Sequence, residues 1–279
     1  MKENVHEQEK APETSVHEII KSLEADGVMP EEIATSAEFI LKDGARKLKN
    51  RQIVINKAQV MVEKPSAEEQ TEEKPKPESD WLNRLFGIVD DISDEDMQGM
   101  WAQILAGEIN NPKSYSIKTI DVLRNMSKED ARLYVDAMKY QCFDDFIISE
   151  KEYGLDLNTK IILTDIGLVS SEDITRTITF CNDSHFRILK KGFCINLDCD
   201  NNELSVIFKG RRLTKAGYEL LQLLDPVTNH ELFDYIGNNI IKGGAKTVAI
   251  HRIIRTDGDS VSYVTTPEKF YSKDDSQSS

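Results

Sequence analysis

The sequence contains few of the residues that mark disulfide-rich, membrane or zinc proteins. Only 4 of its 279 residues are cysteines, no two of them form a CxxC pair, and no histidine stands at zinc-ligand spacing beside them. We therefore predict reduced, mostly buried thiols rather than a disulfide framework. No apolar run approaches the length of a membrane span, and residues 1–15 lack the apolar segment of a signal peptide. These absences predict a cytoplasmic protein with no membrane contact.

Recognisable catalytic motifs are also absent. The chain has no phosphate-binding loop, no G-x-G-x-x-G, no G-x-S-x-G and no H-E-x-x-H. His185, His230 and His251 are isolated in the sequence, although Cys181 and His185 leave a spatial Cys/His nucleophile pair open. The sequence favours a protein that is not an enzyme, and it predicts no cofactor and no metal.

The charge of the chain is acidic, with 35 basic and 49 acidic residues and a net charge of −14. The centre carries the largest share of this imbalance, because residues 81–150 have 7 basic and 13 acidic side chains. Residues 151–271, with 15 basic and 16 acidic side chains, are nearly neutral. Nucleic acid attracts clustered positive charge, so an anionic partner would more readily meet this last part.

Composition divides the chain at residues 63–80, where Pro, Glu, Lys and Ser dominate and almost nothing is apolar. We predict an N-terminal helical segment at 1–62, a linker at 63–80, a helical bundle at 81–142, an α+β domain at 143–271 and a polar tail at 272–279. The fold class predicted is α+β and mainly helical.

The N-terminal segment shows a helical pattern after Pro30. An apolar face is approximated by Ile33, Ala37, Ile40, Leu41, Leu48, Ile55 and Ala58. Gly44 interrupts this face, so one long helix and two shorter helices both remain open. Ser15, three residues before Glu18, has the spacing of a capping box for a short helix further upstream.

Four short helices are expected in the bundle. Ser93 is predicted to cap the second, whose apolar stripe is Met97, Met100, Trp101, Ile104 and Leu105. Pro112 follows it, Ser116 or Ser114 can cap the third, and Ser127 with Asp130 predicts a capping box for the fourth. Short connections predict an antiparallel bundle.

The C-terminal part differs from the bundle in its sequence pattern, because segments typical of strands appear beside segments typical of helices. Residues 145–154 are expected to remain helical, and a short helix ends at Gly167. Three segments rich in Ile, Phe, Val and Thr then predict strands. Thr214 and Asn229 are expected to begin two helices, and Asp257-Gly258 to turn a β-hairpin. A helix, strands and a helix beginning Leu-Thr-x-x-Gly are typical of winged-helix-like domains, which is one reading of this part.

The bundle also resembles a known family. Its pattern consists of Trp81, the run Asp91–Glu95 with Gln98, the run Trp101–Glu108, Pro112, the run Ser116–Leu123, and Ser127 with Asp130-Ala131. This pattern resembles DUF2806, a bacterial family named only as a domain of unknown function. It is more distantly similar to abortive-infection alpha proteins, a bacterial group associated with resistance to phage. The resemblance implies a bacterial, prophage- or defence-linked protein and supplies no site residues.

Basic residues gather near the predicted strands of the C-terminal part. A helix N-terminus beside basic strands suits phosphate contact, whereas a solvated hairpin is the plainer interpretation. The candidate nucleic-acid contacts are Arg187, Lys190, Lys191, Lys209, Arg211, Arg212 and Lys215.

Glu108 is the candidate functional carboxylate. It continues the apolar face of its helix from Met97, Trp101 and Ile104, so we expect it at or inside the core. A structural ion pair with Arg124 or Lys118 is the favoured interpretation, and an acid/base or metal role is the other. The acidic run Asp90–Asp96 lacks calcium-loop spacing and suits a helix N-terminus.

Three functions follow from these observations. The first is a non-enzymatic protein that works through protein contacts, in prophage or anti-phage biology. The second is a nucleic-acid-binding regulator using the C-terminal part. The third is an unrecognised hydrolase or nuclease, which would need converging polar groups in a pocket.

Overall fold

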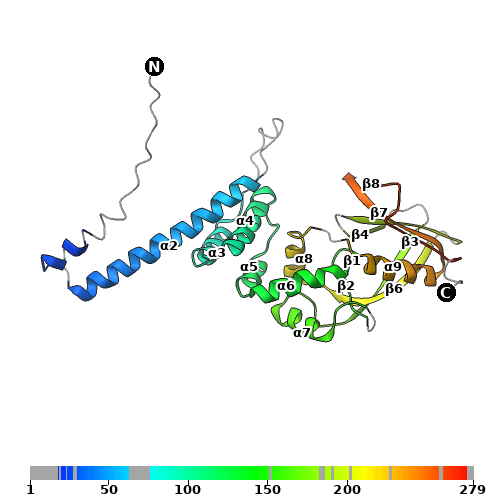
Figure 1. Cartoon of the computed structure of the whole chain (residues 1–279), viewed down its shortest axis with the longest axis horizontal. Helices are drawn as coiled ribbons and strands as arrows, with labels where there is room; N and C mark the ends of the chain where they lie inside the picture. The colour runs from blue at the N-terminus through cyan, green and yellow to red at the C-terminus, as the bar shows by residue number, and fades with distance from the viewer. Residues whose placement is uncertain are drawn as a thin grey trace, which may run out of the picture. The chain divides into compact units, whose positions relative to one another are not determined.

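The computed structural model describes residues 18, 20–22, 24–27, 30–62, 76–150, 153–181, 186–189, 192–200, 203–225, 228–257 and 260–274. The fold is α+β and mainly helical, as predicted (Figure 1). The chain forms two compact units, Met1–Pro112 and Lys113–Ser279. The division falls after Pro112, so the four helices expected as one bundle are shared between the units. Ser15 and most of the linker lie outside the described residues.

The first unit is built on one long helix, α2 (Glu31–Met61). Pro30 occupies its N-cap position, and Glu31 and Glu32 in the first turn suit the positive end of the helix dipole. Gly44 does not interrupt the helix, which settles the alternative between one long and two short helices.

Helices α3 (Ser79–Val89) and α4 (Glu95–Asn110) follow α2 in this unit. Asp94 rather than Ser93 caps α4, because the Asp94 carboxylate accepts a 3.1 Å hydrogen bond from the backbone N–H of Met97. Trp101, Ile104 and Leu105 of the predicted stripe are buried. The other buried apolar residues of these three helices are Val54, Ala58, Trp81, Leu85, Ile88, Val89, Ala102 and Ala106.

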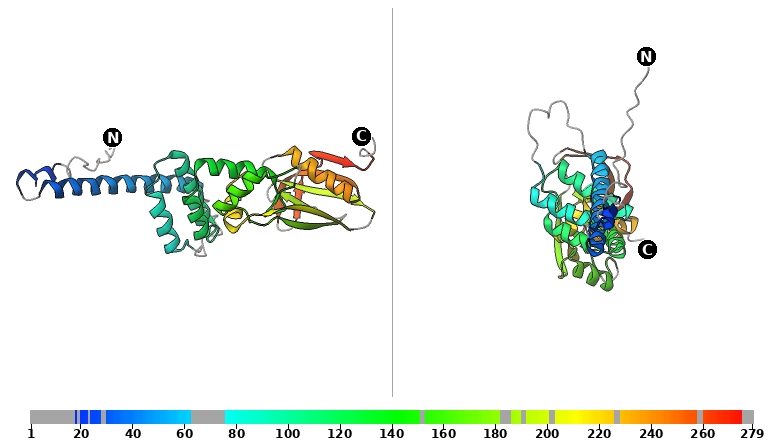
Figure 2. Two further views of the ribbon diagram at one scale, coloured as in Figure 1. Left: turned by 90° about the horizontal axis from the view of Figure 1, so that it is seen from below. Right: turned by 90° about the vertical axis from the view of Figure 1, so that its left-hand side faces the viewer.

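Polar contacts hold α2 against the turn between α3 and α4. Arg51 donates two hydrogen bonds to the Asp90 carboxylate, at 2.9 and 2.6 Å, and its guanidinium lies 5.1 Å from the centre of the Phe86 ring. The Asn50 amide donates to the Asp90 carbonyl at 2.9 Å. These contacts use the second half of α2, whereas the first half extends past α3 and α4 (Figures 1 and 2).

The second unit begins with α5 (Ile117–Arg124), α6 (Lys128–Ala137) and the 3₁₀ turn η2 (Met138–Tyr140). The predicted capping box at Ser127 and Asp130 is present in full. Helix α7 (Leu157–Ile166) ends at Gly167, whose φ of 88° is the left-handed conformation that glycine adopts without strain. The short helix expected there is confirmed.

Two antiparallel sheets follow. The first has the order β1-β2-β6-β3, and the second has β4-β5-β7-β8 with β9 also paired to β7. The strands are β1 (Gln141–Cys142), β2 (Phe146–Ile148), β3 (Ile174–Cys181), β4 (Phe186–Leu189), β5 (Phe193–Cys199), β6 (Glu203–Arg212), β7 (Ala245–Asp257), β8 (Ser260–Tyr263) and β9 (Lys269–Ser272).

One expectation about this unit is wrong. Residues 145–154 were expected to remain helical, but they contain β2, whose Phe146, Ile147 and Ile148 pair with the end of β6. All three side chains are buried, so the strand lacks the alternation of a half-exposed strand and its apolar run fits either element.

Helices α8 (Lys215–Leu221) and α9 (His230–Gly243) begin at the predicted caps Thr214 and Asn229. The apolar face of α9 shares one core with both sheets, including Phe143, Phe208 and Phe233. The hairpin predicted near Asp257 is formed by β7 and β8, while Gly258 lies outside the described residues. Over the described ranges, no helix is both long enough and apolar enough to cross a bilayer.

Candidate functional site

Four of the seven candidate nucleic-acid contacts have described side chains, at the junction of β6 and α8. Side chains alternate between the faces of a strand, so Lys209 and Arg211 lie on one face of β6 and Arg212 on the other. Lys215 is the first residue of α8. The structure therefore brings these residues to one junction but does not place all of them on one sheet face. Lys190, Lys191 and the side chain of Arg187 lie outside the described part.

Carboxylates compensate three of these four cations. Arg211, with 12% of its side chain exposed, donates to Asp173 at 2.7 Å, and this hydrogen bond lowers the pKa of Asp173. Arg212 lies 2.6 Å from Asp145. Lys215 lies 3.7 Å from Glu219. Since binding to phosphates depends on uncompensated positive charge, these pairs weaken the attraction of the junction for nucleic acid.

Glu219 is a buried carboxylate that sequence reasoning missed. It accepts hydrogen bonds from the backbone N–H of Ser116 at 2.6 Å, the Ser116 hydroxyl at 3.1 Å and the Thr119 hydroxyl at 2.5 Å. These donors belong to the N-terminus of α5, where the helix dipole favours an anion. Glu219 lies three residues after the buried Ala216, and that helical spacing was the available signal.

Glu108 is buried on α4, with 3% of its surface exposed, as its place on the apolar stripe predicted. It takes part in at least one polar interaction and is not a free carboxylate. Its expected partners Lys118 and Arg124 lie on α5, in the other unit. The structural ion pair favoured for Glu108, and the alternative acid/base or metal role, both stay predictions.

The acidic run before α4 has structural partners. Asp90 is held by Arg51, Asp91 lies 3.1 Å from Arg46, and Asp94 caps α4. Glu95 and Asp96 stand in the first turn of the helix, where negative charge is favoured. In the part of the chain that the structure covers, no group of three or more His, Cys, Asp or Glu residues is arranged to hold a metal ion.

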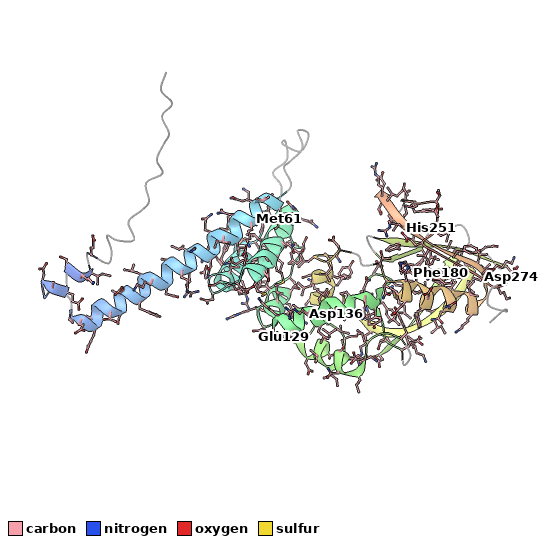
Figure 3. All side chains as sticks on the ribbon, viewed as in Figure 1. Met61, Glu129, Asp136, Phe180, His251 and Asp274 are labelled. Carbon is pink, nitrogen blue, oxygen red and sulfur yellow. The ribbon has the colours of Figure 1, made fainter. Side chains whose placement is uncertain are left out.

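Cys142, Cys194 and His251 are buried within the fold. The four cysteines are not joined by disulfide bonds, and burial raises the pKa of Cys142 and raises that of Cys194 to about 11. Because the thiolate is the nucleophile, such thiols are unreactive at neutral pH. His251 is buried, with its Nδ1 2.9 Å from the Val264 carbonyl oxygen (Figure 3). The pairing of Cys181 with His185 cannot be followed, since His185 lies outside the described residues.

These features define a helix-rich α+β protein. Most of the charged groups described above are engaged in ion pairs and hydrogen bonds within the fold. Residues 43–145 match the family described as "Protein of unknown function (DUF2806)", so the chain carries this domain and the predicted family is confirmed. The match begins within α2 and ends just before β2. No curated protein and no solved structure matches the chain. The similarity to abortive-infection alpha proteins stays a prediction.

Proposed function

We propose that this chain is a bacterial cytoplasmic protein that works by binding other proteins rather than by catalysing a reaction. The observation that carries the proposal is the exposure of large apolar side chains on the first half of α2. Ile33, Ile40 and Leu41, which lie on one face of this half, are 55%, 68% and 47% exposed. Single exposed apolar residues are ordinary on protein surfaces, but several on one projecting helix mark an interaction surface.

The polar clusters of the described residues support the same proposal. Asp90, Asp145, Asp173 and Glu219 each bind a cation or a helix N-terminus within the fold. Groups engaged in this way stabilise the structure and are not poised to act on a substrate. The hydrolase or nuclease alternative stays a prediction without a geometric argument in its favour.

Affinity capture from a bacterial host tests the proposal. The tagged full chain is compared with Ile40→Glu, which places a charge on the exposed apolar surface, and with Phe39→Glu, which changes the neighbouring residue on another side of the helix. We expect Ile40→Glu to lose a partner that the unchanged chain and Phe39→Glu both retain. Identical captured proteins for all three chains would contradict the proposal.

A role in phage defence is the biological setting that we propose. It rests on the similarity to abortive-infection alpha proteins and on no feature of the described residues. Phage plating on a host expressing the chain should fall relative to the same host without it, and Ile40→Glu should restore plating. Equal plating efficiency in all strains would contradict the proposed role in phage defence but would not bear on the proposal of protein binding.

Nucleic-acid binding is the second candidate function, and one topological observation favours it. Strands β2, β6 and β3 are antiparallel neighbours in the first sheet, with α7 directly before β3 and α8 directly after β6. This is the order expected of a winged helix, although β4 and β5 are inserted between β3 and β6. A salt-dependent shift of labelled duplex DNA that Lys209→Glu abolishes would support this function.

A further inference from the structure

Four exposed apolar residues of α2 and two partly exposed small residues between them are arranged symmetrically along the helix. Ile33, Ala37, Ile40, Leu41, Gly44 and Leu48 fall within one stripe about 100° wide at 3.6 residues per turn. Their successive spacings are 4, 3, 1, 3 and 4, which read the same in both directions. Laid antiparallel to a copy of itself, the helix places Ile33 opposite Leu48, Ala37 opposite Gly44, and Ile40 opposite Leu41.

The charges of the helix favour the same orientation. Residues 31–41 carry three acidic and no basic side chains, whereas residues 42–51 carry five basic and one acidic. Four of the five basic residues already pair with carboxylates of their own chain, namely Lys42, Arg46, Lys47 and Arg51. The preferred orientation therefore depends on the net charge of each part and not on new ion pairs. An antiparallel pair sets the acidic part of each helix beside the basic part of the other. A parallel pair sets like charges side by side, and such repulsion suppresses the wrong arrangement.

Gly44 supplies a further observation. Glycine is among the poorest helix formers, yet Gly44 stands inside α2. A Cβ atom added at Gly44 would meet no atom within 4 Å among the described residues, so packing within the chain does not require glycine here. A second helix crossing at Gly44 and Ala37 does require small residues, because they allow the two backbones to approach closely.

We propose that α2 pairs with α2 of a second copy of this chain, antiparallel and centred between Ile40 and Leu41. The stripe ends at Leu48, and the buried Asn50 and Val54 follow it along the helix at angles about 40–80° beyond its Ile40 edge, so the contacts with α3 and α4 lie beside the stripe and not within it. This inference rests on the proposed function and names the partner as the chain itself.

Single-cysteine cross-linking of the full chain tests both the pairing and its direction. Ile40→Cys should give a cross-linked dimer with a short thiol reagent, because the two copies of residue 40 lie next to the symmetry axis. Ile33→Cys should not, since its two copies are separated by about 22 Å along the helices at 1.5 Å per residue. Ile33→Cys mixed with Leu48→Cys should cross-link. The unchanged chain controls for the four native thiols.

Phe39→Cys is the matched control, since residue 39 is highly exposed but lies roughly on the opposite side of the helix. Gly44→Leu distinguishes close packing of the two helices from non-specific hydrophobic association. We expect it to weaken the Ile40→Cys cross-link, because the larger side chain keeps the two backbones apart. Non-specific hydrophobic association would instead strengthen that cross-link. A dimer through Ile33→Cys alone, equal cross-linking at residues 39 and 40, or no cross-link at residue 40 would each overturn the inference. The capture experiment with Ile40→Glu decides the proposed function independently, because it detects partners other than the chain itself.

Discussion

At the scale of the residue, Glu219 connects two helices that are distant in the sequence. Its buried carboxylate accepts from the backbone N–H of Ser116, the N-cap residue of α5, and from the hydroxyl groups of Ser116 and Thr119. Hydrogen bonds to a buried charged group contribute more than neutral ones, and their donors become costly when left without an acceptor. Glu219 is therefore a structural carboxylate.

Replacing Glu219 with Gln should lower the free energy of unfolding by about 1–3 kcal/mol, because it removes the charge and turns an amide donor toward other donors. Urea denaturation followed by circular dichroism measures this. Glu203→Gln, at an exposed position on β6, should change stability by less than about 0.5 kcal/mol. Equal stability of the two variants would show that the Glu219 contacts carry no net energy.

Asp156 gives a pH-dependent prediction. The Thr159 hydroxyl and backbone N–H both donate to this carboxylate, and these hydrogen bonds lower the pKa of Asp156. A pKa that is lower in the folded state contributes stability above the unfolded value of about 3.9, and the contribution is lost as pH falls through the folded pKa. Asp156→Ala should cost about 1 kcal/mol at pH 7, and the difference should narrow below about pH 4. A difference that stays constant from pH 7 to pH 3 would contradict this account.

At the scale of the element, helix packing decides what a glycine contributes. Gly217 of α8 lies so close to the Leu168 carbonyl that an added Cβ would clash with it, and the Tyr134 hydroxyl donates to the Gly217 carbonyl at 2.6 Å. Gly99 of α4 has no atom within 4 Å of an added Cβ in the described part of the chain. Both glycines have helical backbone conformation, but of the two only Gly217 has another described part of the chain packed closely against it.

Alanine should therefore act with opposite sign at the two glycines. Gly99→Ala should stabilise the protein by up to about 1 kcal/mol through helix propensity. Gly217→Ala should destabilise it by about 1–3 kcal/mol, because α8 must move away from Leu168. Thermal unfolding of both variants measures the difference, and stabilisation by Gly217→Ala would show that the close approach is not required.

Local signals predicted the elements well where they were chemically specific. Ser127 with Asp130, Thr214, Asn229 and Gly167 mark helix ends through hydrogen bonds or backbone conformation that depend on neighbouring residues alone. The strand at Phe146 was missed because its partner β6 lies some sixty residues further along the chain, and burial on both faces removes alternation. Long-range pairing leaves little trace in a local pattern.

At the scale of the whole molecule, the sequence predicted the class of fold and the family but not how helices combine. Glu108 was expected in the core and is buried, whereas Glu219 was missed because its donors lie on another helix about a hundred residues away. The apolar face of α2 was recognised as one pattern. In the structure it divides into a buried half around Val54 and an exposed half around Ile40.

That division leads to the central claim, that the exposed half of α2 is an interaction surface that another copy of the chain occupies. A pairing through one six-residue stripe of each α2 forms only a small interface, so the association should be weak and should depend on protein concentration. The unpaired α2 surface on each copy would then remain available whenever the protein is dilute.

Sedimentation velocity of the full chain over a range of concentrations tests this claim most directly. We expect the weight-average sedimentation coefficient of the unchanged chain and of Phe39→Glu to rise from the monomer value toward the dimer value with increasing concentration. Ile40→Glu should remain at the monomer value throughout, with an unchanged circular dichroism spectrum. A chain that stays monomeric at every concentration, or variants at residues 39 and 40 that behave alike, would contradict it.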